Sequence, residues 1–389
     1  MCCTMRREAH LTLVNEGFPF NMSTDLLKKH LPAGTRIVKV KQIASLWAGY
    51  GSILRVSVQP VSRTDPTSYM VKSVAVPDTD LEDVGHVRKL TSYRVEGVFY
   101  SKPEFATAVI QADKDVTLPL PLFVKADDQS TSLVEEFSLF IIMSDLSQAL
   151  PIEQGSLSIC LAKSALRWLA GFHAHFWGSE PVDGGDDERA IYPSGVWKQG
   201  GYWHLSTRLD EFKAIENNKR WTPFKQAAES IASLLRGQSS ETSALPDHAG
   251  KRCFRTLLHG DPKAENILFA AEKSLNDPTP ACGFYDFQYT GYGYGAVDVA
   301  YFLATSVDSD IVETRLDELL DFYYKELVKK LTLRGMTAQA EDYTPAILRT
   351  HFEWALVDWV RFMAGWGTWG NARWAEKTAK EVLATMGFT

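Results

Sequence analysis

The order of apolar and polar residues along this chain predicts two halves of different structure. In the first half, short apolar runs alternate with polar turns, as strands with one buried face do. These runs lie at residues 36–43, 53–58, 69–76, 118–125 and 137–143. One stretch, 80–101, instead repeats apolar residues at helical spacing. We therefore predict five strands and one main helix, preceded by a short helix, with 118–125 at a sheet edge because it contains prolines.

The second half has the pattern of helices, because apolar residues recur every three or four positions. The predicted helices are 159–177, 204–236, 299–304, 310–332, 345–364 and 371–386. The switch follows the apolar run 137–143, so the predicted domains are residues 1–143 and 144–389 and the predicted fold class is α+β. His173 and His175 stand two apart in the first of these helices, which favours core packing over a helical zinc site.

A polar loop between two short apolar runs carries the first chemical signal. Asp261 and Asn266 stand five residues apart in it, and Asp286 follows about twenty residues later, after another apolar stretch. In phosphoryl-transfer enzymes, such a loop places a carboxylate at the acceptor hydroxyl and an amide oxygen at a metal ion. A surface hairpin with chance polar residues is the alternative for the loop taken alone.

The strand region has features that suit a nucleotide. The turn Gly49-Tyr50-Gly51-Ser52 joins two strands, and its glycines permit a close approach of backbone N–H groups to phosphate oxygens. A plain hairpin is the alternative for this turn. Lys72 interrupts the apolar side of the third strand, and Glu96 lies late in the predicted helix. We predict that these two pair; a solvent-facing lysine and Glu82 as the partner are the alternatives.

Composition and charge narrow the function classes. The chain has 389 residues and a net charge of -7, and no basic run stands out, which argues against nucleic-acid binding. Its five cysteines are scattered without a Cys-x-x-Cys pair, as reduced thiols of a cytoplasmic protein are. The polar start lacks a secretory pattern, and no apolar run reaches the length of a membrane helix. The expectation is a cytoplasmic protein without a membrane or nucleic-acid partner.

These motifs resemble those of the aminoglycoside phosphotransferase/choline kinase-like superfamily, and more closely its ecdysteroid-kinase-like branch. The likeness is carried by residues 92–100, 259–266, 286–288 and 298–303. It implies a two-lobed protein-kinase-like fold, in which a small antiparallel sheet with one key helix forms the N-lobe. A larger and mainly helical C-lobe would then carry the catalytic loop. Residues after Asp286 show nothing like the activation segment of protein kinases, which argues against a protein substrate.

The resemblance also implies a role for each motif residue. Asp261 is the acceptor-side base, and Asn266 and Asp286 hold Mg²⁺. Lys72 and Glu96 form the pair that positions the phosphates of ATP. The glycine turn covers those phosphates, the segment 140–145 supplies the adenine-binding hinge with Met143 and Asp145, and Asp298 anchors the catalytic loop. Lys263, two residues after the base, either contacts the γ-phosphate or is simply exposed. The orienting role of Asp261 requires no large shift of its pKa.

The acceptor is expected to bind to the helical half. Tryptophans gather in the last helices, and the predicted acceptor-site residues are Trp354, Asp358, Trp359 and Arg361. A core position for these tryptophans is the alternative. The acidic loop at 183–188 is either solvated or part of a lid. The predicted function is an ATP- and Mg²⁺-dependent kinase that phosphorylates a hydroxyl of a sterol, alkaloid, choline-like amine or sugar. A catalytically silent nucleotide-binding or scaffold protein is the alternative, and the oligomeric state stays open.

Overall fold

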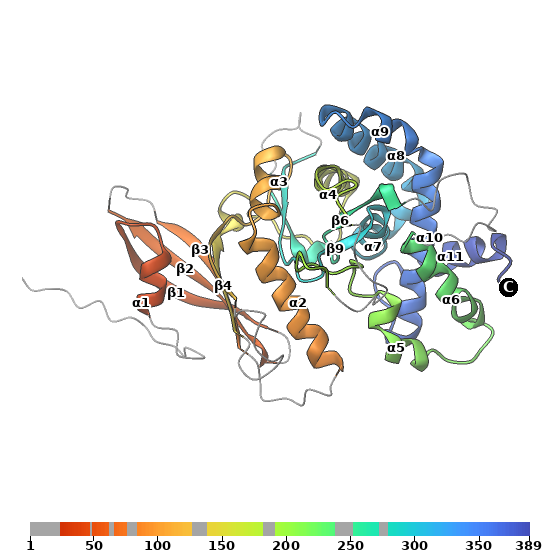
Figure 1. The fold of residues 1–389 in the computed structure, drawn as a ribbon, viewed down its shortest axis with the longest axis horizontal. Helices are drawn as coiled ribbons and strands as arrows, with labels where there is room; N and C mark the ends of the chain where they lie inside the picture. Colours follow the sequence, from red (N-terminus) through yellow and green to blue (C-terminus); the bar gives the residue numbers. More distant parts are fainter. Residues whose placement is uncertain are drawn as a thin grey trace, which may run out of the picture.

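The computed structural model has a β-sheet at one end and a cluster of helices at the other (Figure 1). It describes residues 24–46, 49–61, 66–75, 84–126, 138–181, 191–237, 252–271 and 279–389. The predicted fold class is confirmed, because the sheet is antiparallel and the helices follow it in the chain. The proposed acidic lid at 183–188 and the alternative partner Glu82 lie outside the described residues.

The N-terminal sheet has five antiparallel strands in the order β1-β2-β3-β5-β4. They are β1 (Thr35–Ser45), β2 (Gly51–Pro60), β3 (Thr67–Ala75), β4 (Pro121–Ala126) and β5 (Ser138–Ser144). Buried and half-buried residues alternate strictly along β2, as the period of a strand requires. The proline-containing strand β4 lies at the edge, as predicted.

Helices cover both faces of this sheet. The short helix α1 (Thr24–His30) contributes Leu27, which packs with buried residues of β2 and β3. On the other face, α2 (Val84–Ser101) contacts β4 and β5 and lies between the sheet and the C-terminal half (Figure 1). The short helix α3 (Ala106–Ala112) was not predicted, because its pattern is too brief to stand out.

The C-terminal half is built around α10 (Pro345–Trp366), which contacts α5, α6, α7, α8 and α11. The helices are α4 (Ile159–His175), α5 (Leu209–Ala214), α6 (Thr222–Leu235), α7 (Ala296–Ser306), α8 (Ser309–Leu333), α9 (Thr337–Asp342) and α11 (Ala372–Thr385). The predicted continuous helix at 204–236 is wrong. The Asn218 side chain accepts hydrogen bonds from the backbone N–H groups of Arg220 and Trp221, and Pro223 is tolerated only in the first turn of the helix that follows.

Two small antiparallel pairs of strands hold the loops of interest. β6 (Arg255–Leu258) pairs with β9 (Gly291–Tyr294), and β7 (Ile267–Phe269) pairs with β8 (Cys282–Phe284). The loop with Asp261 therefore joins β6 to β7, and the loop with Asp286 joins β8 to β9. The glycines of β9 hide its strand character in the sequence; a Cβ at Gly291 would lie 2.5 Å from the carbonyl oxygen of Trp197.

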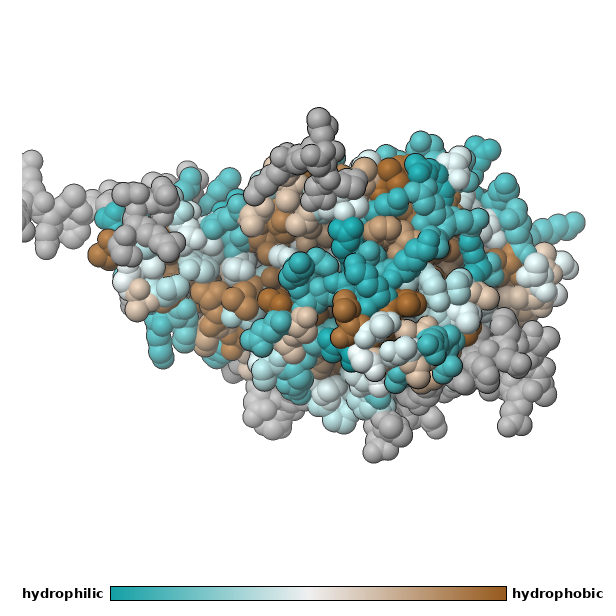
Figure 2. All heavy atoms as spheres, turned by 90° about the horizontal axis from the view of Figure 1, so that it is seen from above, coloured by the Kyte–Doolittle hydropathy of each residue, from teal (hydrophilic) through white to brown (hydrophobic). Residues whose placement is uncertain are grey.

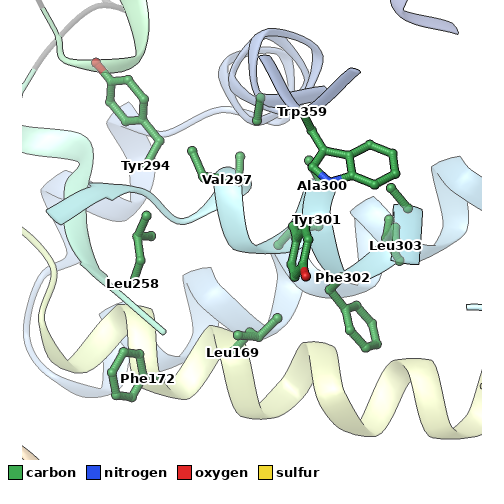
Figure 3. Close-up of a cluster of buried hydrophobic side chains, with 14 of the residues drawn as sticks. Leu169, Phe172, Leu258, Tyr294, Val297, Ala300, Tyr301, Phe302, Leu303 and Trp359 are labelled. Carbon is green, nitrogen blue, oxygen red and sulfur yellow. The ribbon is translucent and has the colours of Figure 1, made fainter. Parts of the chain in front are cut away.

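A large apolar core joins these elements. Figure 3 shows side chains of α7 such as Val297 and Phe302 between α4, which supplies Leu169, and α10, which supplies Trp359. On the face drawn in Figure 2, polar residues cover much of the surface and apolar residues lie between them in smaller groups. Among the described residues, no helix combines the length and the apolar character that crossing a membrane requires.

Candidate active site

A buried carboxylate holds the backbone of the catalytic loop. Asp298 of α7 accepts hydrogen bonds from the backbone N–H groups of His259 (2.7 Å) and Gly260 (3.0 Å). His173 of α4 lies 3.1 Å from the same carboxylate and 2.8 Å from the hydroxyl of Tyr323. The predicted anchoring contact of Asp298 and the predicted core position of His173 are both present, and the loop is fixed from two helices.

Asp261 projects from this loop into a set of donors. Its Oδ2 accepts hydrogen bonds from Nζ of Lys263 (2.9 Å) and from Nδ2 of Asn266 (3.2 Å). Its Oδ1 accepts one from the hydroxyl of Tyr301 (2.9 Å). Burial raises the pKa of Asp261 to about 6, although Lys263 and Tyr301 act in the opposite direction. Asp261, the predicted base, therefore has a raised pKa that the orienting role did not require, and its carboxyl is still mostly ionised at neutral pH.

Lys263 is the partner of Asp261. Burial lowers the pKa of its ammonium, but the charge and hydrogen bond of Asp261, together with the charge of Asp286, outweigh burial and hold that pKa above its usual value. The side chain is 35% exposed, so the ammonium meets both the carboxylate and solvent. Of the two predicted alternatives, simple exposure does not describe this residue, while contact with a γ-phosphate stays a prediction.

Lys72 joins the N-terminal sheet to the second acidic loop. Its ammonium lies 2.5 Å from Oε2 of Glu96 in α2 and 3.1 Å from Oδ1 of Asp286. The predicted pair of Lys72 and Glu96 is therefore present, and both side chains are buried. Burial raises the pKa of Glu96 to about 7 against the opposing charge of Lys72. The flanking carboxylates outweigh the effect of burial on Lys72 and raise its pKa, so this lysine is a fixed positive charge.

The residues predicted to hold Mg²⁺ offer suitable donors. Burial opposes ionisation of Asp286, but the charge of Lys72 holds the pKa of this carboxyl below its usual value. Asp286 has φ of 71°, an uncommon conformation for a residue with a side chain. Both hydrogen bonds from the Asn266 amide nitrogen go to Asp261, which leaves the amide oxygen for another ligand. One carboxylate and one amide oxygen match a Mg²⁺ ion that keeps water and phosphate ligands. In the part of the chain that the structure describes, no cluster of three or more His, Cys, Asp or Glu residues offers another metal site.

The glycine turn closes the hairpin between β1 and β2. Gly51 has φ of 138°, and a Cβ there would lie 2.0 Å from the carbonyl oxygen of Ser73. Gly49 also has positive φ, whereas Tyr50 is buried and its hydroxyl contacts His86 of α2. Ser52, already within β2, is buried as well. The glycines are thus required by the turn itself, and their contact with ATP phosphates stays a prediction.

The predicted hinge residues lie at the end of β5. Met143 is buried in the strand. The carboxylate of Asp145 accepts hydrogen bonds from Ser68 (2.6 Å) and Ser147 (2.7 Å) and pairs with Arg55 (2.8 Å). The Asp145 side chain therefore ties β2 and β3 to the segment that follows β5, and the adenine contact of this segment stays a prediction.

The predicted acceptor-site residues of α10 lie in the core. Trp354 and Trp359 are buried, and Asp358 pairs with Arg361 at 2.8 Å. Arg361 also donates to the backbone oxygen of Trp203 (2.8 Å). They do not form the expected aromatic wall, and Asp358 offers no free charge to an amine. The physical reason is that α10 is surrounded by other helices on most sides, so Trp354 and Trp359 face neighbouring helices.

Other aromatic residues lie beside Asp261. Tyr202 contacts Tyr301 (5.8 Å between ring centroids) and Tyr289 (5.5 Å), and Trp203 stacks on Tyr301 at 4.5 Å. None of these four residues was predicted to belong to the site, although Tyr301 lies within the motif 298–303. A signal existed for Tyr301, because it follows Asp298 by three residues and so shares the helix face that meets the catalytic loop.

Several solved structures are similar to this one in the path of the backbone. Choline kinase from Cryptosporidium parvum Iowa II shares 13% identity, with 94% of this chain and 96% of that chain covered and a TM-score of 0.48. A microcompartment-associated aminopropanol kinase shares 15% identity (91% and 94% covered, TM-score 0.46). An ethanolamine kinase of Plasmodium vivax shares 10% identity (88% and 81% covered, TM-score 0.41). At these TM-scores, no site assignment rests on the likeness.

The sequence itself gives the family. No curated protein matches the chain significantly. The ecdysteroid kinase-like family matches residues 48–336, a span that contains Lys72, Glu96, Asp261, Asn266 and Asp286. With the match covering most of the chain and every residue of the site geometry, the chain belongs to the ecdysteroid kinase-like family.

Proposed function

We propose that this protein is an ATP- and Mg²⁺-dependent kinase that transfers the γ-phosphate of ATP to a hydroxyl of a small molecule. One observation carries the proposal. Side chains from β3, α2 and two loops converge. Lys72 is held by Glu96 and Asp286, and Asp286 lies near enough to Lys263, on the loop of Asp261, for their charges to act on each other. Membership of a kinase-like family supports the same reaction class.

The chemistry needs positioning and positive charge more than covalent catalysis. Asp261 orients the acceptor hydroxyl and accepts its proton late, as the bond between the acceptor oxygen and the γ-phosphorus forms. The bond from that phosphorus to the oxygen bridging to the β-phosphate breaks, and ADP leaves with the bonding electrons. The proton then passes from Asp261 to solvent, which a pKa of about 6 permits near neutral pH.

Two parts of the site would balance the negative charge of the nucleotide. Lys72, fixed between two carboxylates, would direct its ammonium at the phosphates. Asn266 and Asp286 would hold Mg²⁺, which supplies positive charge at the phosphate oxygens when it is bound. The acceptor class stays as broad as the sequence left it: a sterol, an alkaloid, a choline-like amine or a sugar.

The direct test is the substitution Asp261→Asn, which keeps the shape of the side chain and removes its charge. We expect turnover with a panel of metabolites to fall by about 10²–10⁴-fold. Binding of Mg-ATP, followed by thermal shift, should survive. The matched control is Asp210→Asn, because Asp210 is exposed on α5 and pairs there with Lys213, which is exposed as well.

The outcomes separate the candidate functions. Normal turnover by the Asp261→Asn protein would show that Asp261 is not the base. Binding of Mg-ATP by the wild-type protein without turnover of any metabolite would favour the silent nucleotide-binding protein. Failure of the wild-type protein to bind Mg-ATP would rule out the kinase.

A further inference from the structure

We propose that Tyr301 is a positioning residue for Asp261: its hydroxyl holds Oδ1 of the carboxylate and sets the plane in which the base meets the acceptor hydroxyl. The inference rests on the proposed function and adds a residue to the same site. Tyr301 lies in α7, 40 residues after Asp261 in the chain, within the motif 298–303, for which only Asp298 was given a role.

The two oxygens of Asp261 have different neighbours. Oδ2 accepts hydrogen bonds from Lys263 and Asn266, so it faces the side on which the phosphates and the metal ion would lie. Oδ1 accepts a hydrogen bond from the hydroxyl of Tyr301. A carboxylate held at one oxygen can still turn about its Cβ–Cγ bond, and the bond from Tyr301 removes that freedom. Because a carboxylate oxygen accepts two hydrogen bonds, Oδ1 keeps one direction for the acceptor hydroxyl.

Tyr301 is rigid enough for this role. Its side chain is buried, and its ring stacks on Trp203 with 4.5 Å between centroids and 21° between planes. Trp359 of α10 packs near the same ring at 6.4 Å, and Figure 3 shows Trp359 and Tyr301 coming from neighbouring helices. The same helix carries Asp298, which holds the loop backbone. A single helix thus fixes both the backbone of the loop and the orientation of its base.

A second tyrosine packs against Tyr301. The rings of Tyr202 and Tyr301 meet edge to face, with 5.8 Å between centroids and 82° between planes. The half-buried ring of Tyr202 also contacts Tyr289. The one hydroxyl hydrogen of Tyr301 is directed at Asp261, so the packing of Tyr202 helps to hold the residue that orients the base.

The test is Tyr301→Phe, which removes the hydroxyl and keeps the ring on Trp203. The probe is Mg-ATP with water as the acceptor, and the readout is ADP released. We expect kcat to fall by about 10- to 100-fold, the effect of one hydrogen bond to a charged group, while KM for ATP stays unchanged. The matched control is Tyr343→Phe, because Tyr343 is equally buried and its hydroxyl contacts His351 in the core.

A double variant distinguishes positioning from a structural role. If Tyr301 acts through Asp261, the protein with Asp261→Asn and Tyr301→Phe is no slower than the protein with Asp261→Asn alone. Losses that multiply would overturn the proposal, and so would wild-type kcat in the Tyr301→Phe protein. If Tyr301→Phe does not fold, Tyr202→Leu tests the same position, because it removes the ring that packs edge to face on Tyr301. This variant should lower kcat and leave KM for ATP unchanged; an unchanged kcat would contradict the proposal.

The result also separates this inference from the proposed function. A wild-type protein that does not bind Mg-ATP, or an Asp261→Asn protein that releases ADP normally, overturns the proposed function and the role of Tyr301 with it. An Asp261→Asn protein without activity beside a fully active Tyr301→Phe protein overturns the role of Tyr301 alone.

Discussion

The ammonium of Lys263 lies between the base and solvent, and its charge counteracts the burial of Asp261. Substituting Lys263→Met keeps most of the apolar stem and removes this charge. We expect turnover to fall by about 10-fold or more, because the base is then harder to ionise and a positive charge near the phosphates is lost. Steady-state kinetics with Mg-ATP at neutral pH measures the effect.

The control for this prediction is Lys213→Met. Lys213 pairs with Asp210 on the surface of α5, and both side chains are about three-quarters exposed. An exposed pair of this kind contributes little to stability, so the fold should be unaffected. Turnover should not change either, because Lys213 lies on the surface of α5. An equal loss of turnover in the two variants would mean that the pair of Lys263 and Asp261 has no special function in the reaction.

Residues with a fixed spacing could be predicted from the sequence, and residues that depend on packing could not. Asp261 and Asn266 lie in one loop, so their proximity follows from their spacing. The partners Lys72 and Glu96 followed from the order of strand and helix. Tyr202 comes from a segment without a regular pattern, and only the folded chain brings it to the base.

At the scale of the element, the catalytic loop depends on one glycine. Gly260 has φ of 85°, and a Cβ there would lie 2.0 Å from the carbonyl oxygen of Tyr289. Gly260→Ala should therefore destabilise the fold by more than about 2 kcal/mol and abolish turnover, because the backbone of either loop must move. Chemical denaturation and an assay of ADP release measure the two effects.

Gly335 provides the comparison. It also has positive φ (78°), but a Cβ at this position would meet no atom within 4 Å. Gly335→Ala should cost only the conformational strain, about 1 kcal/mol, and leave turnover intact. If both variants lose the same stability, the close contact between the two loops does not constrain Gly260.

Element types were easier to predict than element ends. The strand runs and the long helices of the C-terminal half were found because their periodicity is strong. The segment 204–236 was read as one helix because its apolar spacing continues through Asn218, whose side chain closes a turn instead. The short strand β9 was missed because glycine has a low strand propensity, and its pairing with β6 decides its structure.

At the scale of the whole molecule, an ion cluster connects the segment after α3 with the long helix α8. Nζ of Lys330 lies 2.7 Å from a carboxylate oxygen of Asp113 and 2.7 Å from one of Asp115. Burial opposes ionisation of Asp115, but the hydrogen bond and charge of Lys330 hold its pKa below the usual value. The cluster thus favours the folded state when Asp115 is ionised.

The pH dependence of this contribution has a definite sign. Since the pKa of Asp115 is depressed in the folded state, its stabilisation is present above the unfolded pKa of about 4 and is lost as pH falls through the lower folded pKa. Lys330→Met should cost on the order of 1 kcal/mol at pH 7, and the difference from wild type should shrink below pH 4. Urea denaturation at several pH values measures it. The control is Lys325→Met, because the pair of Lys325 with Asp321 is exposed. The account would be contradicted if the difference in free energy of unfolding between wild type and Lys330→Met did not change with pH.

The two-part architecture could be predicted as a whole, because the change from strands to helices after residue 143 is plain in the sequence. The placement of the acceptor residues could not. Trp354 and Trp359 of α10 resemble the aromatic residues of a binding surface, but the helices packed around α10 bury both. Burial of this kind depends on how many helices pack around α10, and the apolar pattern in the sequence of one helix does not show that number.

The most direct test of the central claim is mass spectrometry of a metabolite extract incubated with the protein and ATP labelled with ¹⁸O in its γ-phosphate. If the protein is a small-molecule kinase, at least one metabolite gains the labelled phosphoryl group with wild-type protein and Mg²⁺. The gain should be absent with the Asp261→Asn protein. The account would be contradicted if no metabolite gains the label although the protein binds Mg-ATP, or if the Asp261→Asn protein transfers it equally well.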